Sequence, residues 1–229
     1  DGRYFQAMEY IPGWTLRELL GMRSIVDERW MPLRAIVRMF TELAEALAKA
    51  HDGGLIHRDV SPSNIMVSEA GVPKLIDFGI ARGLDDIGLT QPGTLKGKYA
   101  YMAPEYIRGM AYDHRVDLFA LGIVLWETLT RTKLFRGNNA ADLLMRVLES
   151  PVPDLAAAPY HLPAGVAAVV ATALERDPDR RFNSAHAMAA ALERAERELP
   201  PSDETASLAR WLVDTIPEEL ALLREREAV

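Results

Sequence analysis

A long stretch in the first quarter of the chain carries apolar residues at the spacing of one helical face. They recur every three or four positions: Leu33, Ile36, Val37, Phe40, Leu43, Ala44 and Leu47. Pro32 stands where a first helical turn tolerates proline, and Gly53-Gly54 follows where helices commonly stop. The pattern predicts a helix between these points with its apolar face in the core. His51, near its C-terminal end, is expected to be a capping or satisfied surface histidine.

A second stretch, His114–Thr130, is apolar on nearly all sides, which is typical of a helix buried inside a protein. Asp117 is a charged residue within this helix, so it needs hydrogen-bond partners, and loop amides are the natural ones. Three further helical patterns follow at Ala140–Leu148, Gly165–Glu175 and Ser184–Leu199. The chain is therefore expected to be mostly helical.

Strands are expected to be few and short. Residues 3–11 are predicted to form a strand that Pro12-Gly13 ends, and Thr15 is the predicted N-cap of a short helix after it. Two short apolar runs, Ile65–Val67 and Leu75–Ile76, flank a turn and predict two more strands. The fold class is predicted to be mostly α (α+β), with short β-hairpins beside a polar loop.

Composition excludes some classes of protein but does not by itself identify a function. The 229 residues suit one large domain or two small ones, and 49% hydrophobic with 26% charged residues is ordinary for a globular protein. Cysteine is absent, which fits a reducing compartment. The net charge of -7 argues against nucleic-acid or anionic-membrane binding, and the longest apolar run, Val166–Leu174, is too short to cross a bilayer. No signal peptide is visible, and the chain begins at Asp1 rather than Met, which suggests a segment cut from something longer.

Three short motifs carry the candidate chemistry. The first is the polar loop His57–Asn64, with the sequence His-Arg-Asp-Val-Ser-Pro-Ser-Asn. Asp77-Phe78-Gly79 follows at the end of the second short apolar run, and Ala103-Pro104-Glu105 comes later. A loop Asp that can accept a hydroxyl proton, with an Asn and a second Asp that can share metal ions, suits phosphoryl transfer from a metal-bound nucleotide. Any one motif is weak evidence, whereas the three in this order form a strong composite.

In these motifs the chain resembles a bacterial Hanks-type serine/threonine protein kinase, and specifically the C-terminal lobe of one. The resemblance implies transfer of the γ-phosphate of ATP to Ser or Thr hydroxyls of a protein substrate, with Mg²⁺ or Mn²⁺, in signal transduction. It also implies a cytoplasmic location, with any membrane anchor outside this segment. Three parts are expected: residues 1–12 as the last strand of the N-terminal lobe and the hinge, 13–198 as the C-terminal lobe, and 199–229 as a helical extension. Two short helices in that extension are predicted to pack on the lobe or to bind a partner.

The resemblance assigns the catalytic and nucleotide-binding roles. Asp59 resembles the catalytic base, and Asn64 and Asp77 resemble the metal ligands. Around the adenine it implies four further residues: Met8 as the gatekeeper, the backbone of Glu9 and Ile11 as hydrogen-bond partners, and Met66 as the floor.

Regulatory and structural roles follow in the same way. Arg58 resembles an arginine that binds a phosphate on the activation segment, residues 80–103, where Thr94 occupies the place of the activating phosphothreonine and Thr90 is the alternative. The structural residues implied are the stacked pair His57 and Phe78, the buried ion pair Glu105 and Arg181, and Asp117 holding the loop backbone.

One departure from the family pattern concerns charge beside the catalytic base. The family usually has a Lys two positions after the catalytic Asp, where this chain has Ser61, and a Gly-Thr where this chain has Gly97-Lys98. We hypothesise an exchange in which Lys98 supplies the ammonium and Ser61 the hydroxyl, keeping a positive charge near the transferring phosphoryl group. The alternative is that Lys98 points to solvent.

A second departure is an absence. The sequence has no Gly-rich loop and no strand Lys followed by a helix Glu, which cover and clamp the nucleotide phosphates in kinases. We therefore expect a kinase fragment, weak or inactive alone, whose N-terminal lobe is supplied in cis or in trans. Two alternatives stay open: a natural half-kinase acting as a non-catalytic binding module, and a small-molecule phosphotransferase of the aminoglycoside or choline kind.

Overall fold

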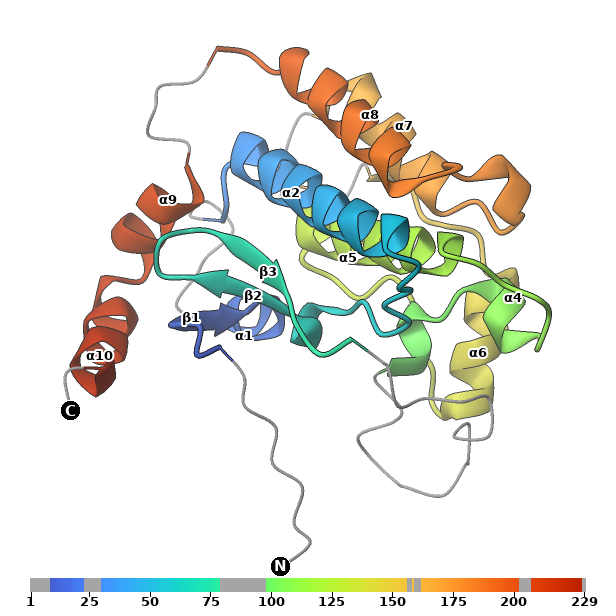
Figure 1. Cartoon of the computed structure of the whole chain (residues 1–229), viewed down its shortest axis with the longest axis horizontal. Coiled ribbons are helices and arrows are strands. Elements are labelled where there is room, and N and C mark those ends of the chain that lie inside the picture. The colour runs from blue at the N-terminus through green and yellow to red at the C-terminus, as the bar shows by residue number, and fades with distance from the viewer. Residues whose placement is uncertain are drawn as a thin grey trace, which may run out of the picture.

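The fold is taken from a computed structural model that describes residues 9–22, 30–78, 98–155, 158, 162–201 and 207–227, with side chains up to residue 223. Helices make up most of these residues, and one small sheet lies at the edge of the helical body (Figure 1). The predicted fold class is confirmed.

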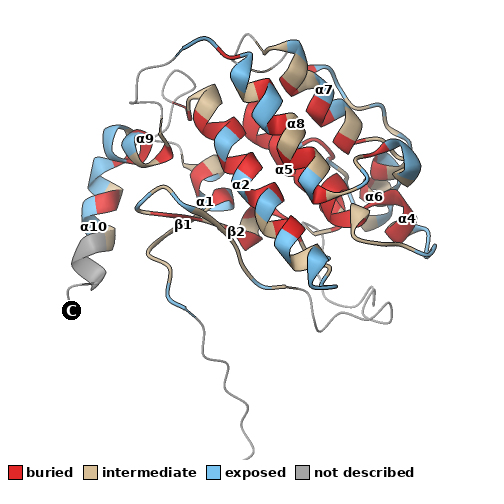
Figure 2. Cartoon of the chain, turned by 45° about the horizontal axis from the view of Figure 1, so that its top comes forward, coloured by how far each residue is buried: buried red, intermediate tan, exposed pale blue. Residues whose placement is uncertain are grey.

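Helix α5 (Arg115–Thr130) is the centre of the helical body, as its uniform hydrophobicity predicts. Every residue from Val116 to Thr130 is buried. Around it pack α2 (Leu33–Asp52), α7 (Ala164–Ala173) and α8 (Ala185–Arg197) (Figure 2).

One glycine sets the distance between α5 and α7. A Cβ atom on Gly122 would lie 2.7 Å from the Cβ of Ala173, so the two helices touch through their smallest side chains. This close approach fixes the inner helix, and therefore everything attached to it, against its neighbours.

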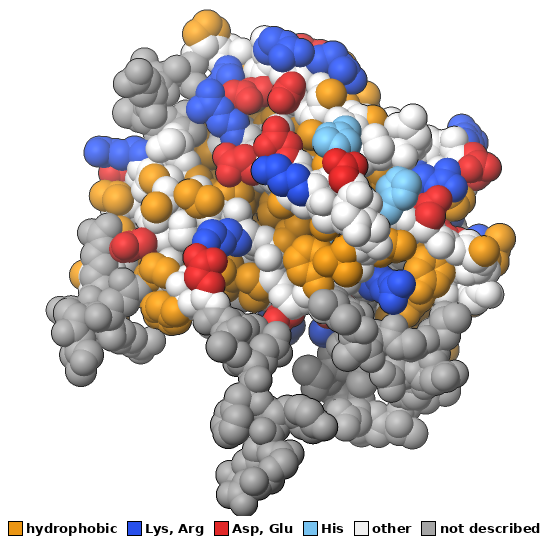
Figure 3. All heavy atoms as spheres, viewed as in Figure 1, with side chains coloured by type: hydrophobic (Ala, Val, Ile, Leu, Met, Phe, Trp, Pro, Cys, Tyr) orange, Lys and Arg blue, Asp and Glu red, His pale blue; other side chains and the backbone are white. Residues whose placement is uncertain are grey.

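Many charged side chains lie on the outside of this body. On the face shown in Figure 3, Lys and Arg side chains lie among Asp and Glu side chains over the helices at the top of the view. Between α2 and α8 these charges form ion pairs, with Arg34 and Arg38 both holding Glu196 at 2.9 and 2.7 Å. Mixed signs and the net charge of -7 give no broad basic field on this face.

The sheet has three antiparallel strands in the order β1 (Gly13–Thr15), β2 (Ile65–Ser68) and β3 (Pro73–Leu75). The turn between β2 and β3 places Ile65 opposite Leu75. The strand predicted at Ile65–Val67 is therefore present, whereas the one predicted at Leu75–Ile76 lies earlier, at Pro73–Leu75.

The strand expected at residues 3–11 is wrong where the structure can test it. Residues 9–12 have no regular secondary structure, and the strand instead begins at Gly13, where the sequence suggested a break. Gly13 permits this pairing because a Cβ atom there would lie 2.1 Å from the carbonyl oxygen of Val67. The glycine thus allows close strand contact and does not end the strand.

The remaining elements are short and connect the body to the site. Thr15 caps the next helix as predicted, with a reciprocal capping box to Glu18. These elements are α1 (Leu16–Gly21), η2 (Pro62–Asn64), η4 (Tyr99–Tyr101), α4 (Pro104–Ile107), α6 (Ala140–Glu149) and η6 (Pro178–Arg180).

The C-terminal extension packs on the lobe. Its helices are α9 (Leu208–Thr215) and α10 (Pro217–Glu227), and the indole of Trp211 meets that of Trp30 edge-on at 5.6 Å. Leu212 and Ile216 are fully buried in the main core. Of the two possibilities left open by the sequence, packing is the one that the described residues show. None of the described helices has the length and hydrophobicity needed to cross a membrane.

Candidate active site

The polar loop His57–Asn64 is anchored to the central helix by Asp117. The two carboxylate oxygens accept hydrogen bonds from the backbone amides of His57 and Arg58, each at 2.8 Å. Arg58 has a φ of 62°, in the left-handed region that non-glycine residues seldom adopt. A buried carboxylate with two amide donors stabilises this bend, so the partners expected for Asp117 are present.

His51 is a third partner of Asp117 that the sequence did not indicate. Its Nε2 lies 2.8 Å from Asp117 Oδ2, and its ring lies 5.1 Å from that of His114. The expectation of a capping or surface histidine is wrong, because the side chain is 8% exposed and turned inward to the helix that holds the loop.

The hairpin brings the second acid beside the loop. Ile76 donates its amide to the carbonyl oxygen of Asn64 at 3.0 Å, so Asp77 follows directly after a residue paired with Asn64. The amide nitrogen of Asn64 donates to the carbonyl oxygen of Asp59 at 2.8 Å. Asp59 and Asn64 are thus joined by this hydrogen bond, and Asp77 follows the hairpin residue paired with Asn64, so the backbone places the three residues near one end of the sheet.

His57 and Phe78 stack where the loop and the hairpin meet. Their ring centroids are 4.4 Å apart, and His57 Nε2 lies 3.2 Å from the carbonyl oxygen of Ile76. Burial lowers the pKa of His57 below its usual range, against the opposing effects of Asp117, Ile76 and Asp59. The imidazole is therefore neutral and acts as a packing and hydrogen-bonding group.

Lys98, which is distant from Asp59 in the sequence, contacts the carboxylate of this candidate base. Its Nζ lies 2.5 Å from Asp59 Oδ2, and it stands at the N-cap of η4. The alternative in which Lys98 points to solvent does not describe this structure. Ser61 is buried, and its hydroxyl has no hydrogen-bond partner among the described residues. The hypothesised contact of the Lys98 ammonium with Asp59 is therefore present. The Ser61 hydroxyl, by contrast, makes no hydrogen bond to the Lys98–Asp59 pair.

The described residues proposed for adenine binding lie on the central strand and in the segment before β1. Met66 lies on β2 between Thr15 and Lys74 and is half-buried. Ile11 is half-buried, and Glu9 is exposed and paired with Lys74 at 2.6 Å. Met8 lies outside the described residues.

The residues for which a regulatory role is expected are described only in part. Arg58 is exposed, and its guanidinium carbon lies 5.8 Å from the ring centre of Tyr112. Thr90 and Thr94, with most of the activation segment, lie outside the described residues, so their roles stay predictions.

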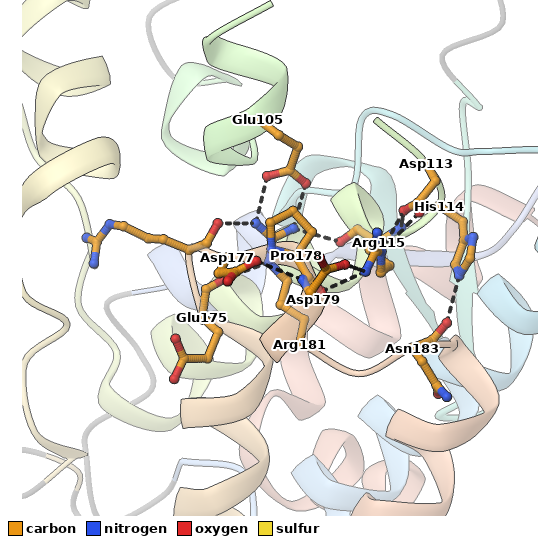
Figure 4. A network of polar contacts seen from close by, with 11 residues as sticks. Glu105, Asp113, His114, Arg115, Glu175, Asp177, Pro178, Asp179, Arg181 and Asn183 are labelled. Carbon is orange, nitrogen blue, oxygen red and sulfur yellow. Dashed lines mark hydrogen bonds and ion pairs between the residues drawn. The ribbon is translucent and has the colours of Figure 1, made fainter. Parts of the chain in front are cut away.

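Glu105 and Arg181 form a buried pair that joins the third motif to the helical body (Figure 4). Both guanidinium nitrogens donate to the carboxylate at 2.6 Å, and Arg181 also donates to the carbonyl oxygens of Glu175 and Arg176. The same guanidinium lies 4.8 Å from the ring centre of Phe119 on α5. The contact expected from the resemblance is thus present, and it ties the end of the activation segment to the central helix.

A polar cluster near the site carries no signal in the sequence. Glu127, buried on α5, accepts hydrogen bonds from the hydroxyl of Tyr101 at 2.7 Å, from Lys133 at 2.8 Å and from the amide of Leu134 at 3.2 Å. Burial and the adjacent Glu127 raise the pKa of Tyr101 well above its usual range, so the phenol keeps its proton and donates. A lone Glu at the end of an apolar helix gave no reason to expect this cluster.

Comparison with known proteins identifies the arrangement. The family model described as protein kinase domain matches residues 1–192. The chain belongs to the protein kinase family. The chain is 38% identical over 200 residues to the serine/threonine-protein kinase PknL of Mycobacterium tuberculosis, covering 87% of this chain and 49% of PknL.

Two other mycobacterial kinases are similarly related. The match to PknD of Mycobacterium tuberculosis is 38% identical over 192 residues, with 83% of this chain and 28% of PknD covered. The match to PknB of Mycobacterium bovis is 38% identical over 197 residues, with 85% and 30% covered. The chain thus spans about half the length of PknL and less than a third of the other two. Its place among bacterial Hanks-type serine/threonine kinases, expected from the motifs, is confirmed.

Proposed function

We propose that this chain carries the catalytic half of a kinase that transfers the γ-phosphate of ATP to Ser and Thr hydroxyls of proteins. The observation that supports this most directly is the Asp59 carboxylate, held on a loop that Asp117 anchors and paired with Lys98 at 2.5 Å. In this proposal Asp59 accepts the proton of the substrate hydroxyl as that oxygen attacks phosphorus.

Asn64 and Asp77 suit a divalent cation such as Mg²⁺ or Mn²⁺. Because the Asn64 amide nitrogen already donates to the Asp59 carbonyl, its side-chain oxygen is the atom left for a cation. One carboxylate, one amide oxygen and the oxygens of a nucleotide form the hard donor set that Mg²⁺ prefers. The cation would supply charge neutralisation at the phosphates, while Asn64 and Asp77 fix where it binds.

Lys98 is proposed to place a positive charge beside the transferring group. The ammonium neutralises Asp59 before substrate binds and remains beside the phosphoryl oxygens as charge develops on them. The buried Ser61 hydroxyl is proposed to hydrogen-bond within the same site once substrate is present. Arg58 and Thr94, or Thr90, are proposed to form the regulatory arginine–phosphate contact.

We further propose that a nucleotide-covering lobe comes from residues outside this sequence, in cis or in trans. The sequence lacks the glycine-rich loop and the lysine strand that cover the phosphates in kinases. Met8, the backbone of Glu9 and Ile11, and Met66 would then line the adenine side of the closed site. Residues 1–229 alone are expected to bind ATP weakly and turn over poorly.

Replacing Asp59→Asn in the full-length protein tests the proposal. Phosphate transfer from labelled ATP to Ser/Thr peptides is expected to fall by about 10²–10⁴-fold, the usual loss on removing a general base. Asp214→Asn, an exposed aspartate on α9, is the matched control and should keep full activity. Equal transfer by Asp59→Asn and wild type would contradict the assignment, and no transfer by wild type would favour the binding-module alternative.

A further inference from the structure

A positively charged side chain from outside the three motifs reaches the catalytic loop. Arg17, an exposed residue of α1, donates from Nη1 to the hydroxyl of Ser63 at 3.4 Å, and Ser63 directly precedes Asn64. This placement follows from the fold, because α1 packs against η2, the turn that contains Ser63. In Figure 1, α1 lies next to the sheet at the same side of the helical body as this turn.

Arg17 also lies near Tyr101 at the end of the activation segment. Burial and Glu127 raise the pKa of Tyr101, and the nearby charge of Arg17 acts in the opposite direction. The guanidinium therefore contacts the catalytic loop and acts electrostatically on a residue of η4, and these two elements flank Asp59 and Lys98.

Glu127, the buried acidic residue beside Tyr101, already accepts hydrogen bonds from partners within the protein. Glu127 is 1% exposed and is satisfied by Tyr101, Lys133 and the amide of Leu134. A carboxylate with three donors and almost no exposed surface has little capacity left for a basic substrate residue.

The basic side chains of Lys98, Lys133 and Arg17 differ in whether they pair with an acidic side chain. Lys98 and Lys133 each hold a carboxylate, Asp59 and Glu127 respectively. Arg17 forms no ion pair with an acidic side chain in the described parts of the chain, and its contact there is with the neutral Ser63 hydroxyl. The adjacent Glu18 is occupied at 2.7 and 2.8 Å by the backbone and side chain of Thr15. Within the described ranges, the rim beside Asp59 therefore presents a guanidinium that is paired with no acidic side chain.

We propose that Arg17 selects acceptor segments with an anionic group next to the phosphorylated Ser or Thr. The proposal rests on the phosphoryl-transfer function above and adds its substrate class. A guanidinium binds a carboxylate or a phosphate through two parallel hydrogen bonds, whereas it repels lysine and arginine side chains. The anion is supplied by Asp or Glu, or by a residue that another kinase has already phosphorylated.

Peptide kinetics with the full-length protein test this selection. Four peptides share one Thr acceptor and differ in its flanks, which carry Ala, Glu, Lys or phosphoserine. At low salt, wild type is expected to show kcat/KM about tenfold higher for the Glu than for the Lys peptide, mainly through KM, because like charges repel across an interface. Arg17→Ala should bring the two within about twofold, and Arg17→Glu should reverse the order.

Ratios between peptides do not depend on how much of a variant is folded, so a loss of active protein cannot imitate the result. Arg210→Glu is the matched control, because Arg210 is an exposed helical arginine on α9, outside the α1–η2–η4 neighbourhood, and should retain the wild-type ratio. A phosphoserine peptide favoured over the Glu peptide would assign the anion to prior phosphorylation, and the opposite order would assign it to Asp or Glu.

Three outcomes would count against the inference or its basis. Equal use of all peptides, or preference for Lys, overturns the substrate class while leaving the kinase function intact. An acidic preference that survives Arg17→Glu overturns the role of Arg17. Absence of transfer to every peptide and of autophosphorylation overturns the proposed function, and the inference falls with it.

Discussion

The two sides of the candidate site are built very differently. The catalytic loop is tied to the buried helix α5 through Asp117, with two amide hydrogen bonds at 2.8 Å, and the third motif is tied to it through the buried Glu105–Arg181 pair. The adenine side, at residues 9–12, has no regular secondary structure, and its ion pair from Glu9 to Lys74 is largely exposed.

The two sides differ in the kind of contact that holds them in place. Groups that need fixed geometry for chemistry are attached to a helix with no exposed face, where alternative arrangements would leave buried charges unsatisfied. The edge that would meet an adenine ring is held by surface contacts, which contribute little to stability. The side that carries Asp59 is therefore held by buried contacts, whereas the side proposed for adenine is held by exposed ones.

The largest test of this comparison is Arg181→Met, which removes one partner of the buried pair. Glu105 would be left charged, buried and unpaired, so the free energy of unfolding in urea should fall by about 3–5 kcal/mol. The adjacent Arg180→Met is the control, because Arg180 is 69% exposed and lies 3.4 Å from Glu175. Similar losses from both variants would contradict a special role for the buried pair.

Lys98→Ala is expected to affect catalysis more than folding. Removing a positive group beside the developing charge should lower kcat by about 10²–10³-fold, as the loss of one preorganised donor does elsewhere. Lys98 is partly exposed, so the urea midpoint should move little. Lys49→Ala, on the exposed face of α2, serves as the control in the same kinase assay. Normal kcat in Lys98→Ala would show that its contact with Asp59 has no catalytic role.

A weaker effect is expected from pH through His57. Burial lowers its pKa in the folded state, so below the ordinary value of about 6.5 the unfolded chain binds a proton that the folded chain does not. Stability should therefore fall as the pH drops below about 6.5, until the folded pKa is reached, by at most about 1.4 kcal/mol per pH unit for one proton.

Urea unfolding of wild type and His57→Phe between pH 7.5 and 5.5, values chosen to bracket the ordinary pKa, separates this contribution. The variant keeps an aromatic ring against Phe78 and loses the titrating group. Its stability should depend less steeply on pH than that of wild type. Equal slopes would mean that His57 takes up its proton as readily in the folded protein as in the unfolded chain.

The smallest effect is expected on the adenine side. Lys74→Ala removes the ion pair with Glu9, whose side chains are 38% and 70% exposed. Exposed pairs contribute about 0–1 kcal/mol, so thermal and urea unfolding should be nearly unchanged. A large loss of stability would show that this edge is held as firmly as the catalytic loop and would remove the contrast between the two sides.

Hydrophobic periodicity and the three motifs together were sufficient to predict much of the fold and of the candidate site. The apolar face of α2, the uniform hydrophobicity of α5 and the three motifs predicted the core, the buried helix and the family. Asp117 was expected to find loop amides because a charge inside an apolar helix needs donors, and it does.

Contacts between distant residues were harder to predict. The strand at Gly13–Thr15 was missed because glycine usually weakens strands, whereas here it permits close contact with Val67. His51 was placed at the surface because one helical position carries no information about the helix packed against it. The exchange of Ser61 and Lys98 suggested that an ammonium would approach Asp59, but it could not predict that the Ser61 hydroxyl lacks a partner.

The sequence by itself determined which apolar faces form the core and which chemistry is available, because burial of apolar residues follows hydrophobic periodicity and chemistry follows residue type. The tertiary structure alone decided which charges meet: Lys98 with Asp59, Glu127 with Lys133, and Arg17 beside Ser63, with no acidic partner in the part of the chain that is described. The physical reason is that charge interactions act over a few ångströms between residues far apart in sequence, so their partners are set by how helices and loops pack.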